Sequence, residues 1–474
     1  MQPLDPARYE ERLARFDELI HVSESFDIVR KELLLGGKLH AVYYYINAFS
    51  NSALTEKLMN FLTADASSFL PDEELLFASL PYAEVSREAD GSKAQYALMS
   101  GASVLLCESI RDYWIFDTRN YPSRGIEEPQ KDRTLRGSRD GFVESLVPNT
   151  GLLRRRIRDP RFVIRKLTVG SSTMTDLAVF YLDGVADASY VKKLTDRISS
   201  IRVDGLNIGI ESLAEVLVKG YWNPFPKIRY TERPDTACAT IMEGGVIILC
   251  DNYPSAMLLP TSLFDFMQDT DDFYFPPLIG GYLKIIRMGT YAVSLLLTPV
   301  WLLLARNPAW VPARLQFILP QEAAALPLYL QLLLLEISID GLKLASLNTP
   351  DALTNSLSVI GGLLIGDYAV SLGWLSKPVI LYMAFVSIAN FTQPNYEMGY
   401  AFKLMRLLTI SLISLFDLWG FLAGILITIL FIVTNPTTGG RSYLYPLVPF
   451  NGRALRRLFF RAKLRETPEN NENS

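Results

Sequence analysis

Carboxylates inside strongly apolar stretches are the side chains of this sequence best placed to do chemistry. Glu336 and Asp340 follow the apolar residues 323–335, and Asp367 and Asp417 lie in further apolar segments. A charged side chain at membrane depth is costly, so such residues usually mark the path of an ion or a substrate. Residues four positions apart share one helical face, so Glu336 and Asp340 would point the same way. In a ring of copies, the four carboxylates are candidates to line a cation pathway.

Two other interpretations of Glu336 and Asp340 stay open at this point. Their carboxylates could reach the membrane surface, where water solvates them, or they could pair with Lys343 and Arg406. Either arrangement would explain a charge in an apolar stretch without any conduction of ions.

The sequence offers little support for an enzyme. Its two histidines, His21 and His40, both lie near the N-terminus, which argues against a histidine metal site or a Ser-His-Asp triad. Cys107, Cys238 and Cys250 have no CxxC spacing, so we interpret them as reduced, buried thiols of a chain that faces a cytoplasm. We therefore expect no catalytic residue, no bound metal and no cofactor.

Glycines before two apolar runs could suggest a nucleotide-binding loop. Gly101, Gly244 and Gly245 precede such runs, but neither GxxxxGK[ST] nor GxGxxG occurs there. The sequence instead favours a tight turn before a strand at each place. The acidic stretch 269–272 is interpreted as a solvated turn.

One phrase occurs twice in the chain. Residues 98–109 read LMSGASVLLCES and residues 241–252 read IMEGGVIILCDN, so the Met, the first Gly, a Leu and the Cys match. Upstream of each copy, from residues 41 and 178, an apolar strand precedes a helix-like amphipathic run. Chance similarity between two buried strands is the alternative, but two separate segments recur in the same order. The sequence therefore predicts two similar α/β subdomains.

Composition separates a charged N-terminal part from an apolar part at 288–433. A chain of 474 residues is also too long for one core. We predict an α/β cytoplasmic region of two similar subdomains, followed by an all-α polytopic transmembrane domain. The predicted boundaries are a helical arm at 1–25, subdomains at 26–125 and 170–275, a basic helical connector at 126–169, the transmembrane domain at 280–450, and a basic then polar tail at 451–474.

Four apolar stretches are candidates to cross a membrane. Residues 288–305 carry no charge and are just long enough to span. Residues 357–375 and the shorter 378–392 are the next two candidates. Residues 404–433 are interpreted as one long helix with a kink near Asp417 and Gly420.

A further segment and a glycine pair complete the membrane prediction. Residues 321–346 contain a short apolar run followed by charges, which suits an interfacial or re-entrant helix. Gly362 and Gly366 stand in a small-xxx-small arrangement that lets two helices pack closely.

Basic residues flank the predicted spans and indicate their orientation. Lys284 and Arg287 precede the first span, and several arginines and lysines follow the last one. Loops rich in Lys and Arg stay on the cytoplasmic side, and the N-terminus lacks the pattern of a secretory signal. We therefore expect both termini on the cytoplasmic side.

Arginines are concentrated in residues 133–167, between the two repeats. Few aromatic residues accompany them, and Leu152, Leu153 and Ile157 recur at helical spacing, which argues against nucleic acid. A basic amphipathic connector fits a neighbouring subunit or anionic lipid headgroups. The candidate contact residues are Arg136, Arg139, Arg154, Arg155, Arg156 and Arg158.

Several long motifs resemble one known family. They are RGSRDGFVESLVPNTGLLRRRIRDPRF at 136–162, NPFPKIRYTERPD at 223–235, the stretch 251–274, LPLYLQLLLLEISIDGLKLAS at 326–346, GGLLIGDYAVSLGWLSKP at 361–378 and ANFTQPNYEMG at 389–399. Together they resemble the A subunit of the GerA-type spore germination receptors over about residues 20–450. The chain departs from the family pattern at Ser138, Asp140, Asp340 and Lys343.

The resemblance implies a multi-pass protein of the spore inner membrane whose termini face the spore core. It implies a ring-shaped homo-oligomer, a pentamer, that conducts monovalent cations and amplifies the response to germinants. The implied partners are a small membrane protein, other receptor subunits and membrane lipids, without nucleic acid. Two alternatives stay open, a non-conducting receptor subunit or scaffold and, with less support because the spans show no inverted repeat, a secondary transporter.

Overall fold

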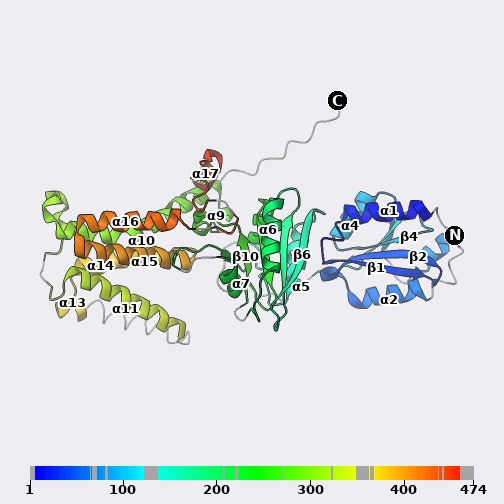
Figure 1. Cartoon of the computed structure of the whole chain (residues 1–474), viewed down its shortest axis with the longest axis horizontal. Helices are drawn as coiled ribbons and strands as arrows, with labels where there is room; N and C mark the ends of the chain where they lie inside the picture. The colour runs from blue at the N-terminus through cyan, green and yellow to red at the C-terminus, as the bar shows by residue number, and fades with distance from the viewer. Residues whose placement is uncertain are drawn as a thin grey trace, which may run out of the picture. The chain divides into compact units, whose positions relative to one another are not determined.

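The chain forms two compact units in the computed structural model (Figure 1). Unit 1 comprises Met1–Lys219 and Ile228–Pro260, and unit 2 comprises Gly220–Lys227 and Thr261–Ser474. The structure describes residues 6–64, 66, 72–80, 84–121, 137–206, 209–218, 222–269, 271–321, 324–348, 362, 368–435, 437–439 and 442–459.

The first subdomain of unit 1 is built on a five-stranded antiparallel sheet in the order β1-β2-β4-β5-β3. Its strands are β1 (Ile28–Leu35), β2 (Leu39–Ile46), β3 (Val85–Glu88), β4 (Ser103–Cys107) and β5 (Tyr113–Phe116). Residues 41–44 of β2 are all buried, because helices cover both faces of the sheet. Their branched and aromatic side chains suit a pleated, enclosed strand.

Two helices cover each face of this sheet. Helices α1 (Pro6–Leu19) and α4 (Gly91–Met99) pack on the face that includes Val42 and Tyr44. Helices α2 (Ser52–Thr63) and α3 (Glu73–Ala78) pack on the face that includes Ala41 and Tyr43. Tyr9, Leu13 and Phe16 place one stripe of α1 in the core, and Ile20 follows directly after the helix. Residues 6–25 of the predicted separate arm therefore pack as part of this subdomain.

The second subdomain repeats the same plan. Its strands are β6 (Phe162–Val169), β7 (Thr175–Leu182), β8 (Arg229–Thr231), β9 (Val246–Cys250) and β10 (Ala256–Leu259), in the order β6-β7-β9-β10-β8. Helices α5 (Leu146–Arg156) and α8 (Pro234–Met242) cover one face. Helices α6 (Ala188–Ser199) and α7 (Ile210–Leu217) cover the other.

The strand orders confirm the predicted duplication. The two copies of the repeated phrase form the end of α4 with β4 and the end of α8 with β9, which occupy equivalent places in the two sheets. Gly101 and Gly244 have φ values of 94° and 86°, and both lie in the turn between helix and strand. This left-handed backbone explains why each copy needs glycine there.

The basic connector is shorter than predicted. Helix α5 ends at Arg156, and residues 162–169 form the edge strand β6 of the second sheet rather than a helix. Arg165 and Lys166 contributed to the connector's basic appearance, yet they belong to this strand. A charged edge strand resists pairing with another sheet, so these residues have a local structural role.

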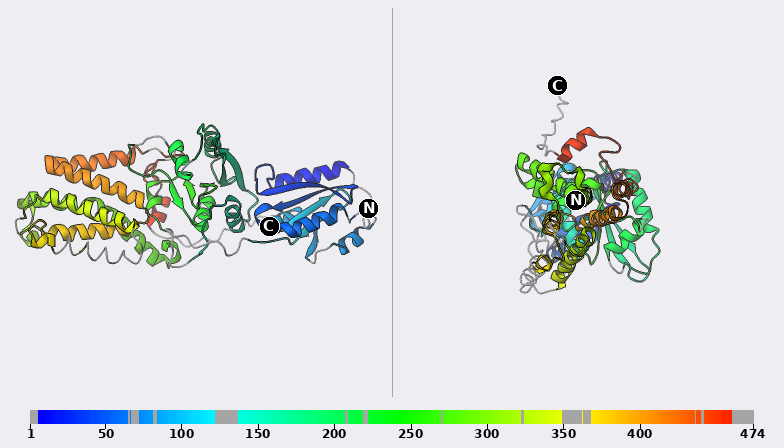
Figure 2. Two further views of the ribbon diagram at one scale, coloured as in Figure 1. Left: turned by 90° about the horizontal axis from the view of Figure 1, so that it is seen from below. Right: turned by 90° about the vertical axis from the view of Figure 1, so that its left-hand side faces the viewer.

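Unit 2 is a bundle of helices (Figures 1 and 2). The helices are α9 (Asp271–Tyr274), α10 (Pro277–Arg306), α11 (Leu328–Asn348), α13 (Ala369–Ser371), α14 (Lys377–Phe391), α15 (Tyr396–Phe416), α16 (Leu418–Val433) and α17 (Gly452–Phe459). Short 3₁₀ turns occur in the two units at Asn47–Phe49, Leu263–Met267, Pro308–Trp310 and Ala313–Ile318. By length and composition, α10 and α15 are the two described helices that could cross a membrane.

Helix α11 falls largely within the predicted interfacial or re-entrant segment 321–346 and packs inside the bundle. It has 21 residues and packs beside α14 and α15. At 1.5 Å per residue it is about 31 Å long, comparable to the hydrocarbon core of a bilayer. Its charged residues therefore lie within the bundle.

The prediction of one long helix over 404–433 is wrong. The backbone reverses at Asp417, which has a positive φ of 51°, and α15 and α16 form an antiparallel hairpin. Gly424 faces Thr409 and Gly420 faces the backbone of Leu412, so small residues permit this close approach. A pattern of apolar residues alone does not distinguish one tilted helix from a tight hairpin.

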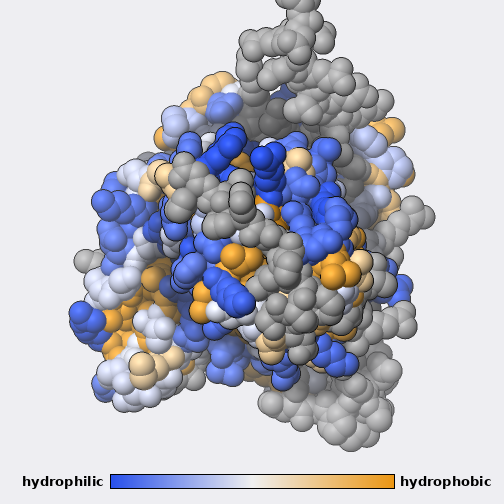
Figure 3. All heavy atoms as spheres, turned by 90° about the vertical axis from the view of Figure 1, so that its right-hand side faces the viewer, coloured by the Kyte–Doolittle hydropathy of each residue, from blue (hydrophilic) through white to orange (hydrophobic). Residues whose placement is uncertain are grey.

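The described surface differs between the two units. Hydrophilic residues cover most of the face of the first subdomain that Figure 3 turns toward the viewer. Unit 2, by contrast, exposes large apolar side chains along α14 and α16, including Phe385, Trp419 and Leu426. Apolar patches of this extent are typical of surfaces that contact lipid or another protein.

Candidate functional site

Two carboxylates and two cations meet inside the bundle of unit 2. Glu336 and Asp340 lie on α11, and Lys403 and Arg406 lie on α15. The Lys403 Nζ is 2.9 Å from Glu336 Oε2 and 2.6 Å from Asp340 Oδ1. Arg406 Nη2 donates a hydrogen bond to Glu336 Oε1. We call these four residues the charge cluster.

Helical spacing brings the charge cluster together. Glu336 and Asp340 are four residues apart and Lys403 and Arg406 are three apart, so each pair occupies one face of its helix. The two helices run antiparallel, since Tyr329 of α11 lies near Ser411 of α15. Pairing of Glu336 with Arg406 was one open interpretation of the sequence, and it is present.

Arg406 also connects the charge cluster to two further helices. Its Nη1 donates to the carbonyl oxygen of Ser294 at 2.5 Å and lies 3.2 Å from the Ser294 hydroxyl. That hydroxyl donates to Asn390 Oδ1 at 2.5 Å. Residues of α10, α11, α14 and α15 therefore contribute to one polar network within the bundle.

Burial differs within the charge cluster. The side chains of Glu336, Arg406 and Lys403 are 2%, 0% and 8% exposed, whereas Asp340 is 33% exposed. Removing one partner of a buried ion pair leaves an uncompensated charge and costs about 3–5 kcal/mol. Glu336 is therefore tied into the fold, and Asp340 is the acidic group that keeps access to its surroundings.

Lys343 lies one helical turn beyond Asp340 and faces aromatic rings. Its Nζ is 4.5 Å from the centroid of Phe391 and 5.7 Å from that of Tyr400. A cation above a ring face is stabilised by the ring's quadrupole. The structure thus directs Lys343 toward these rings, whereas the open interpretation paired it with the carboxylates.

The other predicted pore residues lie elsewhere. Asp417 sits at the turn between α15 and α16, where Asn307 donates to both of its oxygens at 3.1 and 3.0 Å and Arg306 lies 3.4 Å away. Its visible contacts therefore hold the end of α10 against the hairpin. Asp367 and Gly366 lie outside the described residues. A Cβ added at Gly362 would meet nothing within 4 Å among the described atoms.

Arg154 joins the two subdomains of unit 1 and is not available for lipid or another subunit. Its guanidinium is fully buried and pairs with both oxygens of Asp27, at 2.9 and 3.1 Å. It also donates to the carbonyl of Phe162 at 2.7 Å and stacks over that ring. For this arginine the predicted surface role is wrong, because its partner lies 127 residues away in the sequence.

The remaining connector arginines have different surroundings. Arg155, Arg156, Arg158 and Arg139 are exposed, and Arg136 lies outside the described residues. Arg155 stacks on Tyr121 at 4.9 Å. These exposed arginines stay predicted contacts with a subunit or a lipid headgroup.

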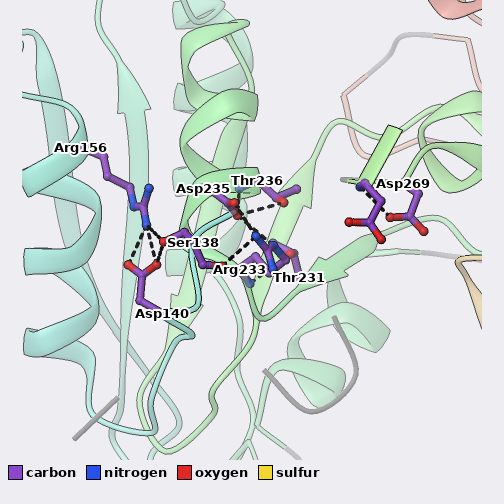
Figure 4. A network of polar contacts seen from close by, with 9 residues as sticks. Ser138, Asp140, Arg156, Thr231, Arg233, Asp235, Thr236 and Asp269 are labelled. Atoms are coloured by element: carbon purple, nitrogen blue, oxygen red, sulfur yellow. Dashed lines mark hydrogen bonds and ion pairs between the residues drawn. The ribbon is translucent and has the colours of Figure 1, made fainter. Parts of the chain in front are cut away.

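Two of the long sequence motifs meet in unit 1 (Figure 4). Arg156 Nη2 donates to both oxygens of Asp140, at 2.6 and 2.7 Å. Burial opposes ionisation of Asp140, but Ser138 and Arg156 outweigh it and lower the pKa of this carboxyl. The buried Arg233 donates to the Ser138 carbonyl at 3.1 Å and pairs with Asp235. The first motif and the end of the second motif, at Arg233 and Asp235, therefore form one folded junction.

The start of the second motif belongs to unit 2 instead. Phe225 is 1% exposed and packs edge-on against Phe402 of α15, with centroids 5.4 Å apart. Asn223 donates to the carbonyl of Phe431 at 2.7 Å, and Tyr443 donates to that of Pro226 at 2.8 Å. Phe402 directly precedes Lys403 in the sequence, so this segment contacts the residue next to a member of the charge cluster.

Sequence reasoning missed several of these residues. Lys403 and Ser294 were not singled out, although Lys403 stands three residues before Arg406 at the edge of a predicted span. That spacing was a usable signal for a basic pair facing the acidic pair of another helix. Among the described residues, no group of three or more His, Cys, Asp or Glu side chains could hold a metal ion.

A comparison with known protein families shows to which family the chain belongs. A family model described as "Bacillus/Clostridium GerA spore germination protein" matches residues 16–472. The chain belongs to the GerA spore germination protein family. This match covers both units and includes every motif on which the sequence resemblance was based.

Individual GerA relatives extend this result. Stage V sporulation protein AF of Bacillus subtilis is 35% identical over 95% of this chain and 91% of its own length. Spore germination protein KA of the same organism is 27% identical over 93% of this chain and 82% of its own length. The relatives are spore germination and sporulation proteins, which supports a role in germination for this GerA member.

A solved structure is also similar. It is the crystal structure of the N-terminal domain of the A subunit of the Bacillus megaterium spore germinant receptor GerK3. The sequence identity is 24% and the TM-score 0.38, over 53% of this chain and 94% of that one.

Proposed function

We propose that this GerA-family chain is a multi-pass protein of the spore inner membrane and a subunit of a pentameric ring that conducts monovalent cations during germination. Both termini would face the spore core. The proposed neighbours are other copies of the chain, a small membrane protein, other receptor subunits and membrane lipids. The proposal includes no nucleic acid, cofactor or catalytic step.

The charge cluster is the observation that carries the proposal. Apolar side chains would hold α11 against α15 without the cost of desolvating charges. Four ionised groups at this contact therefore indicate a role other than packing. Charges retained at membrane depth are most often part of an ion pathway. Asp340 is the acidic member with the largest exposed fraction, 33%, so it is the group best placed to meet a passing cation.

Relatives and composition support the location. The chain shares its family with proteins named for spore germination and sporulation. Helices α10 and α15 are each long and apolar enough to cross a bilayer. The unpartnered apolar side chains of α14 and α16 would then contact lipid or a neighbouring subunit.

Particle symmetry tests the ring. The full chain purified in a mild detergent should give images with five-fold symmetry around a central axis. Single copies, or an assembly whose centre is closed by lipid in every class, would contradict the proposal.

Flux distinguishes a channel from the alternatives. Purified protein in sealed liposomes should release K⁺ faster than protein-free liposomes, in proportion to the amount of protein. A release rate equal to the protein-free control would favour a non-conducting receptor subunit or scaffold. Saturation of flux with one organic solute would instead favour a transporter.

A further inference from the structure

We propose that the Lys403 ammonium is a tethered cation that occupies a monovalent-cation site between Glu336 and Asp340 and competes there with mobile ions. The inference rests on the proposed cation conduction and assigns a site and a regulatory residue to it. The ligand class is a dehydrated monovalent cation such as K⁺.

The geometry of Lys403 resembles that of a bound ion. One ammonium bridges two carboxylates that lie one helical turn apart, at 2.9 and 2.6 Å. An ammonium group and a potassium ion have the same charge and a similar size. The oxygens that hold one can therefore hold the other.

The surroundings of Asp340 support the same assignment. Its Oδ1 is buried and lies 2.6 Å from Lys403 Nζ. Among the described residues, this ion pair is the contact that the structure shows for that oxygen. A buried carboxylate that loses its cationic partner is costly, so a mobile cation would be favoured in the place of the ammonium.

Glu336 keeps its own partner when a mobile cation replaces the Lys403 ammonium. Arg406 binds its Oε1 and is itself held by Ser294, at 2.5 Å to the carbonyl oxygen. Loss of the lysine would leave Glu336 neutralised and in place. Asp340 would lose its nearest cation, because Lys343 faces the rings of Phe391 and Tyr400.

The aromatic side chains packed beside Lys403 connect it to the segment Gly220–Lys227. Phe402 contacts Phe225 and Tyr291, at centroid distances of 5.4 and 5.3 Å. Phe225 belongs to Gly220–Lys227, which leaves unit 1, enters unit 2 and returns to unit 1. A shift of this segment would move the residue adjacent to Lys403, so it can change how well the ammonium fits between the carboxylates.

The first test measures cation binding without requiring conduction. Thermal unfolding of the full chain in detergent is compared in K⁺ and in N-methylglucamine, a cation too large for the site, at equal ionic strength. Wild type and Lys403→Arg should unfold at the same temperature in both salts. Lys403→Gln should unfold several degrees higher in K⁺, because ligand bound only to the folded state stabilises it.

A double variant provides the matched control. Lys403→Gln with Asp340→Asn keeps the Glu336–Arg406 pair and should show no K⁺-specific stabilisation. Equal unfolding temperatures of Lys403→Gln in the two salts, or equal aggregation in both, would overturn the inference. Folding of Lys403→Gln in K⁺ but not in N-methylglucamine would support it.

Flux separates this inference from the proposed function. Lys403→Gln should release K⁺ from liposomes about tenfold faster than wild type, which corresponds to about 1.4 kcal/mol in the barrier. If K⁺ stabilises Lys403→Gln but neither wild type nor the variant releases K⁺ from liposomes, the cation site is supported and the proposed channel is rejected. Release from wild type that is unchanged in Lys403→Gln would keep the channel and reject Lys403 as the competing cation.

Discussion

At the scale of single residues, the buried pair between Asp27 and Arg154 joins the two subdomains of unit 1. Arg154→Met should lower the free energy of unfolding by about 3–5 kcal/mol, because Asp27 is left buried and unpaired. Arg155→Met removes an exposed arginine one position away and should cost less than about 1 kcal/mol. Urea unfolding measures both, and equal losses would show that burial of the pair contributes nothing.

The three cysteines provide a prediction on pH. Burial raises the pKa of Cys107 to about 11 and those of Cys238 and Cys250 to about 12, from an ordinary value of 9.0. Above pH 9 the unfolded chain loses thiol protons that the folded chain keeps, so stability should fall as pH rises toward 11. At pH 8 the folded protein should react slowly with a thiol reagent and the urea-unfolded protein quickly. Rapid labelling of a native thiol would contradict this.

At the scale of helices, the α15–α16 hairpin depends on small residues. A Cβ added at Gly424 would lie 2.5 Å from Thr409 Oγ1, whereas one at Gly289 of α10 would meet nothing within 4 Å. Gly424→Ala should therefore separate the two helices and lower the unfolding temperature, and Gly289→Ala should leave it unchanged or slightly raised. Thermal unfolding in detergent decides between these outcomes, and a tolerated Gly424→Ala would refute the close packing.

The segment around Phe225 gives a second prediction at this scale. Phe225 is 1% exposed, whereas Trp222, three residues earlier, is 93% exposed. Phe225→Ala should cost about 3–5 kcal/mol by opening a cavity against Phe402 and Tyr291. Trp222→Ala should have little effect on the same unfolding measurement. If the tryptophan variant were the less stable one, the docking of this segment in unit 2 would be wrong.

At the scale of the whole molecule, the sequence predicted what depends on local pattern. Strands β4 and β9 fall where the repeated phrase placed them, and the duplication follows from two recurring segments. Contacts between distant residues were not predictable in this way. Arg154 has its partner 127 residues away. The pair between Arg406 and Glu336 was only one of several open interpretations, and the contacts of Lys403 with Glu336 and Asp340 were missed.

The reversal at Asp417 could not be predicted for a related reason. Residues 404–433 are mostly apolar on both sides of Asp417, so their hydrophobic pattern is the same for one helix or for two. Contacts across the turn, such as that between Gly424 and Thr409, distinguish the hairpin. Similarly, a dense run of arginines did not indicate that Arg154 is buried while Arg155 is exposed.

The central claim is that cations pass the Asp340 carboxylate of an assembled ring, and K⁺ release from liposomes tests it most directly. Asp340→Asn should assemble as wild type does and release K⁺ about tenfold more slowly. Glu56→Gln, which changes an exposed carboxylate of unit 1, should release K⁺ at the wild-type rate. Equal rates for wild type and Asp340→Asn would contradict the account.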